Sequence, residues 1–253
     1  MVIRIATVSG GKDSTAMLIL LAQQGVRLDY AIFNNTGIEH PLTIDFVRGK
    51  LRDYVRAHFG IDITELHPKP SFGELVRKYG VPHKPFGRWC CRLLKEEPFR
   101  KWLVANFKGE ELILYYGYSA DESGRFNAAQ QRKLPKKMGI KAQIEAPLIQ
   151  AQIGEDAALE ICKKHDLLNP LYEQGFKRTG CYLCPFMPLR SWRLLYHKYP
   201  RLWRIAKALE ELSIKKKGHG FFPNYTLSNL EDRFKASKLT DWLGGVDGQD
   251  NSP

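Results

Sequence analysis

The segment Ser9-Gly10-Gly11-Lys12-Asp13-Ser14 holds the residue types that bind a phosphate group. Adjacent glycines let the backbone approach an anion closely and leave N–H groups directed at it. Lys12 adds a mobile cation, and Asp13 can hold Mg²⁺ or cap a helix. The spacing differs from the Walker A pattern. We therefore predict a phosphate-binding loop with Lys12 and Asp13 as catalytic residues; an ordinary capped turn is the alternative interpretation.

Four of the five cysteines form two close pairs, Cys90 with Cys91 and Cys181 with Cys184. Four thiolates can hold a structural zinc ion or a [4Fe–4S] cluster. Adjacent cysteines do not reach one zinc ion with relaxed geometry, whereas a cubane offers a separate iron to each sulfur. We therefore predict a [4Fe–4S] cluster, with Zn²⁺ or four unliganded buried cysteines as alternatives. Cys162 has no partner and is predicted to lie in the core.

The elements that position these residues alternate between strand and helix. Short β-branched runs predict strands, and apolar residues at helical spacing predict helices. The predicted strands cover residues 2–8, 28–33, 63–66, 111–118 and 142–147. The predicted helices cover residues 15–22, 44–59, 72–79, 98–107 and 153–165. This alternation indicates an α/β fold, a mostly parallel twisted sheet with helices on both faces, in which the loop at 9–14 joins the first strand to the first helix.

The loop resembles the PP-loop of the N-type ATP pyrophosphatase superfamily, because all six positions of the Ser-Gly-Gly-x-Asp-Ser signature match. Over residues 1–187 the chain is similar to the phosphoadenosine phosphosulfate (PAPS) reductase-like branch. Its cysteines resemble the cluster ligands of iron–sulfur adenylyl sulfate (APS) reductases. The resemblance implies an adenine nucleotide alpha hydrolase-like fold that binds ATP with Mg²⁺, or a PAPS-like nucleotide.

Two turns that follow predicted strands are also similar to that family. The first turn, Asn35-Thr36-Gly37, stands where the family has Asp-Thr-Gly, with Asn in place of Asp. From its residues alone, this segment is a turn after a strand. In open α/β sheets, however, ligands bind at the carboxyl ends of strands. The second is similar to the family's nucleotide-binding turn, although Ser119 stands where Arg is usual. The resemblance implies nucleotide contacts by Asn35, Thr36, Gly37, Gly117 and Arg125, the last as a phosphate ligand.

The chain is basic, with 39 Lys and Arg against 27 Asp and Glu and a net charge of +12. Residues 163–217 hold 13 of these cations and only four of the acids, so the excess gathers around the second cysteine pair. Aromatic and basic residues are interleaved there, as on nucleic-acid surfaces. An amphipathic helix pair with inward-facing aromatics is the alternative. We predict a nucleotide-binding domain at 1–187, a basic helical region at 188–243 and a disordered tail at 244–253.

The longest early apolar run, residues 16–22, is far shorter than the roughly 20 residues that span a bilayer. No signal peptide is recognisable at the N-terminus. We therefore expect a cytoplasmic protein with reduced thiols and no membrane partner.

The predicted function is ATP-dependent sulfur insertion into a nucleic acid, tRNA or DNA, with release of AMP and pyrophosphate. A sulfur donor or reductant protein is the expected partner. The alternatives are a PAPS or APS reductase that forms sulfite and an iron–sulfur nucleic-acid-binding protein without catalysis. Reductases of the family carry their nucleophile in a C-terminal Glu-Cys-Gly motif, and no cysteine follows Cys184 in this sequence. This difference favours sulfur insertion.

Overall fold

The computed structural model of the chain describes residues 2–85, 89–131 and 139–236. Its centre is a sheet of five parallel strands in the order β3-β2-β1-β4-β5. The strands are β1 (Val2–Val8), β2 (Tyr30–Asn34), β3 (Ile63–Leu66), β4 (Glu111–Tyr115) and β5 (Lys141–Glu145). All five predicted strands are present, with ends displaced by at most three residues. The predicted parallel α/β sheet is therefore confirmed.

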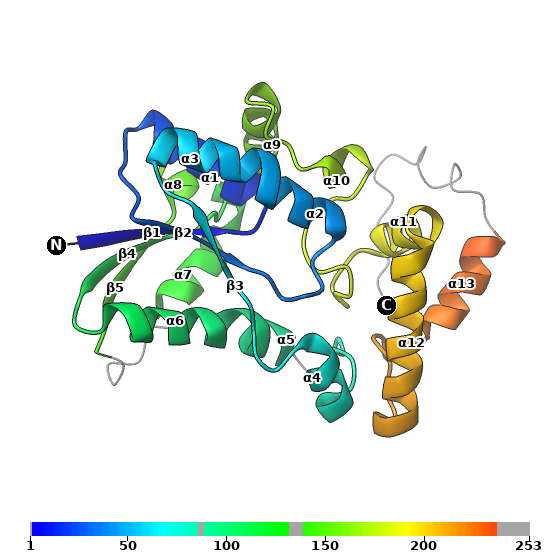
Figure 1. The fold of residues 1–253 in the computed structure, drawn as a ribbon. Coiled ribbons are helices and arrows are strands. Elements are labelled where there is room, and N and C mark those ends of the chain that lie inside the picture. The colour runs from blue at the N-terminus through cyan, green and yellow to red at the C-terminus, as the bar shows by residue number, and fades with distance from the viewer. Residues whose placement is uncertain (1, 86–88, 132–138, 237–253) are drawn as a thin grey trace.

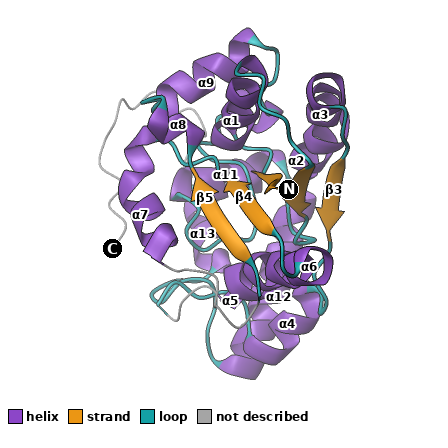
Figure 2. Cartoon of the chain, turned by 90° about the vertical axis from the view of Figure 1, so that its left-hand side faces the viewer, coloured by secondary structure: helices purple, strands orange, loops and turns teal. Residues whose placement is uncertain are grey.

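Helices cover both faces of the sheet, as predicted (Figure 2). On one face lie α1 (Lys12–Gln23), α3 (Arg52–Phe59) and α9 (Glu155–Lys164), and on the other lies α6 (Glu97–Phe107). Apolar side chains of α1, α3 and α9 pack against alternate residues of β1 and β2 in one core, and α6 packs against the opposite residues in another. The strands are apolar on both sides because both sides are buried. Short helices α8 (Pro147–Gln150) and α10 (Pro170–Glu173) flank α9.

The helix predicted at residues 44–59 is interrupted. It consists of α2 (Pro41–Phe46), a π-helical turn at Val47–Leu51, and α3. The backbone of Gly49 inside the turn is not helical, with φ −101° and ψ −110°. Glycine disfavours regular helix and accepts such a conformation at low cost, which accounts for the kink.

The predicted helical region after residue 187 contains α11 (Leu189–Lys198), α12 (Pro200–Lys217) and α13 (Leu227–Lys235). These helices lie beyond the carboxyl ends of the strands (Figure 1). Helix α4 (Phe72–Tyr79) packs against α12, so the two parts of the chain share a core. Trp192 and Trp203 are buried in that core. Packing therefore accounts for these two aromatic side chains, in agreement with the alternative of inward-facing aromatics.

Other elements complete the described chain. They are α5 (Trp89–Cys91), a π-helical turn at Arg92–Glu96, a 3₁₀ turn at Ala120–Glu122 and α7 (Ser123–Gln131). None of the helices within the described ranges combines the length and apolar character of a membrane span. The tail predicted at 244–253 lies outside the described residues.

We expect the folding stability of the protein to depend on pH through His40. Its buried ring caps α2, with Nδ1 accepting a hydrogen bond from the Leu42 N–H at 3.2 Å, and packs edge-on against Tyr199. Burial lowers the pKa of His40 from 6.5 to about 4. The unfolded chain thus takes up a proton between these values while the folded chain does not. Stability is full above pH 6.5 and falls as the pH drops toward 4.

We expect unfolding by urea to show a loss of about 2 kcal/mol from this residue between pH 7 and pH 5. The variant His40→Asn keeps a capping side chain but does not titrate. Between pH 7 and pH 5, the stability of this variant should therefore fall by about 2 kcal/mol less than the stability of the wild type. Equal slopes for the two proteins would refute the assignment to His40.

Candidate active site

A cavity of about 450 Å³ lies at the carboxyl ends of β1, β2 and β4. Its walls include the ends of these strands, the loop at residues 9–14 and the segment after β4. The strand order reverses between β1 and β4, and open α/β sheets bind ligands at such a point. The volume lies in the range of ligand pockets. The architecture thus places the predicted phosphate-binding loop in a cavity of suitable size.

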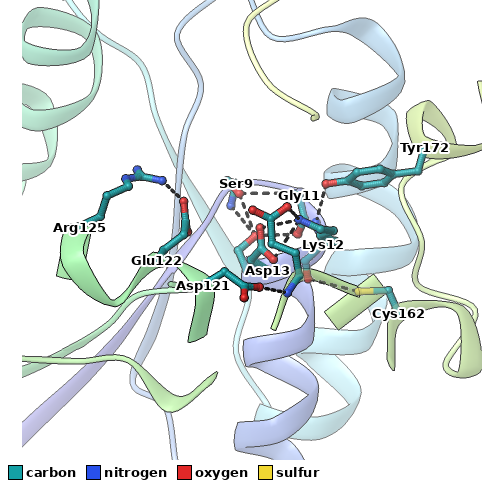
Figure 3. Close-up of polar contacts among 11 residues, drawn as sticks. Ser9, Gly11, Lys12, Asp13, Asp121, Glu122, Arg125, Cys162 and Tyr172 are labelled. Carbon is teal, nitrogen blue, oxygen red and sulfur yellow. Dashed lines mark hydrogen bonds and ion pairs between the residues drawn. The ribbon is translucent and has the colours of Figure 1, made fainter. Parts of the chain in front are cut away.

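Two glycines, one in the loop and one after β4, allow the loop to pack closely against its neighbours. Gly10 has φ +72°, and a Cβ there would lie 2.8 Å from the Val47 side chain. A Cβ on Gly117, after β4, would lie 2.7 Å from the backbone of Ser14. The Ser9 N–H donates to Ser14 Oγ at 3.1 Å, which closes the loop (Figure 3). Of the six predicted loop residues, all but Gly10 line the cavity.

Lys12 is held, not mobile, which corrects the sequence-based expectation. Its side chain is 9% exposed, with Nζ at 2.9 Å from Glu155 Oε2 and 3.2 Å from the Asp13 carboxylate. Burial lowers the pKa of Lys12, but the two carboxylates outweigh it and the net shift is upward. Burial raises the pKa of Asp13, while Lys12 opposes that rise. The buried Lys12 side chain is therefore neutralised by two partly exposed carboxylates.

Two residues that hold the loop were missed by the sequence reasoning. The Lys12 N–H donates to the Tyr172 hydroxyl at 3.0 Å, and Glu155 binds the Lys12 side chain. Asp121 accepts a hydrogen bond from the Glu155 N–H at 2.7 Å and so fixes the start of α9 (Figure 3). The contacts of Tyr172 and Glu155 with Lys12 join residues more than 100 positions apart, for which local spacing carries no signal.

Gly117 and Arg125, for which the resemblance implies nucleotide contact, both line the cavity. Arg125 is exposed, pairs with Glu122, and stands 5.5 Å from the centre of the Tyr118 ring (Figure 3). Its exposed guanidinium thus lies at the cavity wall, paired with the Glu122 carboxylate. A phosphate contact by Arg125 remains a prediction.

Asn35, Thr36 and Gly37 are placed beside the cavity and not among the residues that line it. The Asn35 carboxamide accepts from the Gly37 N–H at 3.0 Å and donates to Glu65 at 3.2 Å. Thr36 Oγ1 donates to Glu39 at 3.0 Å. These bonds shape a turn that presents Glu39 to the cavity; direct nucleotide contact by the three predicted residues is still a prediction.

The four paired cysteines come together, although 89 residues separate the pairs. The pKa of the Cys90 thiol is raised by a hydrogen bond with Cys91, by burial, and by the charges of Cys91, Cys181 and Cys184. The side chains of all four are half-buried. In the part of the chain that the structure describes, no three His, Cys, Asp or Glu side chains surround a single metal-ion position. The thiol donor set suits a cluster that offers each sulfur its own iron.

Glu39 and Lys95 connect these cysteines to the cavity. Cys181 Sγ donates to Glu39 Oε1 at 3.3 Å, and Lys95 Nζ lies 3.3 Å from the same oxygen. Both Glu39 and Lys95 line the cavity, and the charge of Glu39 is the main cause of a raised Lys95 pKa. The sequence reasoning missed both residues. The cavity therefore reaches from the loop to Glu39, the hydrogen-bond partner of Cys181, and none of the four paired cysteines, all in the described part of the chain, is among the residues that line it.

Cys162 lies in the core, as predicted, and is fully buried. Its Sγ donates to the Lys12 carbonyl at 3.3 Å beneath the loop (Figure 3). Burial raises its pKa to about 12. A thiol that stays protonated and inaccessible is a poor nucleophile.

The sequence and the fold were compared with known proteins. The profile of the phosphoadenosine phosphosulfate reductase domain matches residues 4–187. An uncharacterized protein of Methanocaldococcus jannaschii is 33% identical over 196 residues, which are 77% of this chain and 38% of that protein. The chain thus spans well under half of that relative's length.

Two solved structures resemble the chain at low sequence identity. The PAPS reductase from Candida auris, in a phosphate complex, has 19% identity and a TM-score of 0.48, covering 70% of this chain and 80% of that one. The U34-tRNA thiolase NcsA from Methanococcus maripaludis, with its [4Fe–4S] cluster, has 18% identity and a TM-score of 0.45, covering 92% and 71%.

Proposed function

The chain belongs to the phosphoadenosine phosphosulfate reductase domain family, and within that family we propose that it is an ATP-dependent sulfurtransferase acting on a nucleic acid. One observation carries the proposal: a single cavity is lined by the phosphate-binding loop and by Glu39, which bonds to Cys181. A nucleotide on the loop then lies in the same cavity as Glu39, whose carboxylate accepts a hydrogen bond from Cys181. Activation and sulfur delivery can follow one another on the same bound substrate.

In the first step, an oxygen of a tRNA base or a DNA phosphate attacks the α-phosphorus of ATP. A bond forms from that oxygen to phosphorus while the bond to pyrophosphate breaks. Lys12 Nζ and the loop N–H groups stabilise the charge that develops on the phosphate oxygens. A sulfide nucleophile from a donor protein then displaces AMP, which leaves with the substrate oxygen. Sulfur thus replaces oxygen in the nucleic acid.

Asp13 is the residue for Mg²⁺, because its carboxylate borders the cavity next to the loop. Magnesium usually binds one or two carboxylates together with nucleotide phosphates. A [4Fe–4S] cluster would be held by Cys90, Cys91, Cys181 and Cys184, and when bound it would supply a sulfur- or electron-carrying centre beside the cavity. Glu39 and Lys95 then orient whatever group enters between that centre and the loop.

A sulfonucleotide reductase is the second candidate, favoured by the family match over residues 4–187. Such an enzyme needs an accessible thiolate to attack the sulfonyl sulfur. Cys162 does not meet that need, since it is fully buried with a pKa of about 12. Equilibrium binding of ATP, PAPS and APS separates the candidates: the proposal predicts ATP binding, and tight PAPS binding without ATP binding would reverse the ranking.

The basic helical region is the proposed nucleic-acid surface. Arg201 and Arg204 are exposed on α12, and within the described residues neither forms an ion pair with an acid. By contrast Arg193, which the sequence placed in the same basic stretch, is buried. Helix α12, which carries Arg201 and Arg204, lies beyond the carboxyl ends of the strands (Figure 1).

Reversing two of these charges tests the surface. We expect Arg201→Glu with Arg204→Glu to weaken nucleic-acid binding at least about tenfold and to reduce the slope of log affinity against log salt by about 2, because each lost phosphate contact lowers it by about 1. Fluorescence anisotropy with labelled tRNA and duplex DNA measures both quantities. The control reverses Lys101 and Lys108, which are exposed on and just after α6. An equal effect in the control would show that only net charge matters.

A further inference from the structure

The cavity is lined by more acidic than basic residues, whereas the chain as a whole is basic. The chain carries a net +12. The described cavity wall, however, holds five acids and four cations: Asp13, Glu39, Glu96, Glu122 and Glu155 against Lys12, Lys95, Arg125 and Arg178. A nucleotide brings several negative charges into this slightly acidic space. Without added positive charge, its binding there is opposed.

Lys12, the cation of the phosphate-binding loop, already forms ion pairs with two carboxylates. Lys12 Nζ lies 2.9 Å from Glu155 and 3.2 Å from Asp13, in a buried position where a charge contact is strong. A metal-free phosphate must compete with Glu155 for Lys12. A divalent cation that arrives with the phosphates removes this competition, because carboxylates are its preferred protein ligands.

The fold itself sets the place of Glu155. The residue begins α9, its N–H donates to Asp121 at 2.7 Å, and α9 is anchored on α1 through the buried residues Ala158 and Cys162. The side chain remains 42% exposed and lines the cavity. Glu155 is therefore fixed at its backbone and reachable at its carboxylate, as a residue that senses the ligand must be.

We propose that Glu155 determines nucleotide specificity at this site, by blocking Lys12 from metal-free sulfonucleotides and admitting a nucleotide that carries a divalent cation. The inference rests on the proposed function of the loop as the nucleotide site. By this inference, a residue of α9, more than 140 residues from the loop, determines whether the site binds a metal–ATP complex or a metal-free PAPS-like ligand.

The test measures equilibrium binding of ATP and PAPS by calorimetry, with Mg²⁺ and with EDTA. We expect Mg²⁺ to tighten ATP binding to the wild type by at least about tenfold, the size of one charge contact. In Glu155→Gln, metal-free ATP and PAPS should bind about tenfold more tightly, and the Mg²⁺ dependence of ATP binding should shrink. Glu155→Asp keeps the charge and should restore the dependence in part.

Glu160→Gln is the matched control, because Glu160 lies on the same helix, is exposed, and pairs with Lys163 and not with the loop. It should behave as the wild type. If Glu155→Gln leaves the ratio of affinities with and without Mg²⁺ unchanged while the wild type binds ATP, the inference is wrong and the proposed function stands. If the wild type binds PAPS tightly and ATP under neither condition, both fail.

Discussion

Replacing Lys12 by alanine is expected to lower ATP-dependent pyrophosphate release by a factor of about 10³, near the upper end of what a single charge-stabilising group contributes. Lys12 is the one cation in the loop, and its Nζ lies in the cavity between Asp13 and Glu155. Its loss removes the cation that we propose stabilises the transferred phosphate, and leaves the carboxylates of Asp13 and Glu155 unpaired in the cavity. Turnover is measured as pyrophosphate released from ATP with the nucleic-acid substrate present.

Lys163→Ala is the control for this variant, because Lys163 is an exposed lysine on α9 that pairs with Glu160. It should retain wild-type turnover. Circular dichroism and urea unfolding establish that the Lys12 variant is folded, since its ion pair is partly buried. Unchanged pyrophosphate release by a folded Lys12→Ala protein would remove the loop from the mechanism.

The second large effect is expected from Cys181→Ser. Anaerobically prepared protein should contain about four irons and absorb broadly near about 400 nm, as cubane clusters do. Cys181 lies close enough to Cys90 for its charge to raise the Cys90 pKa, and its thiol donates a hydrogen bond to Glu39, which lines the cavity. Serine is a poorer iron ligand than a thiolate, so the variant should lose most of its iron and its absorbance.

Cys162→Ala is the control for the cluster, because Cys162 is the fifth cysteine and lies in the core beneath the loop. Its iron content should equal that of the wild type. Stoichiometric zinc without iron in the wild type would contradict the cluster and support the alternative metal. Metal analysis by mass spectrometry reports both elements in one sample.

The sheet was predictable because its signal is local. The β-branched run at Val2–Val8 and the short run at Ile63–Leu66 are strands with the expected ends. Glycine at residues 10 and 11 placed the loop between β1 and α1. The interruption near Gly49 was not predicted, because the apolar spacing of residues 44–59 continues across the kink.

The candidate site was predictable only where its residues are contiguous. Ser9–Ser14 could be recognised as a group, but Glu155 and Tyr172 reach Lys12 through tertiary packing. Glu39 and Lys95 meet only because the turn after β2 lies beside the segment after Cys91. Their spacing in the chain contains no repeat or motif that indicates the contact. The charge of the cavity wall likewise emerges only from the folded arrangement.

Product analysis with ATP labelled in the α-phosphate tests the central claim most directly. The protein is prepared anaerobically and incubated with Mg²⁺, nucleic acid, a sulfide donor and the labelled ATP. The account predicts AMP and pyrophosphate in equal amounts, together with one sulfur incorporated per AMP. Formation of ADP, or release of sulfite from PAPS with no cleavage of ATP, would contradict it.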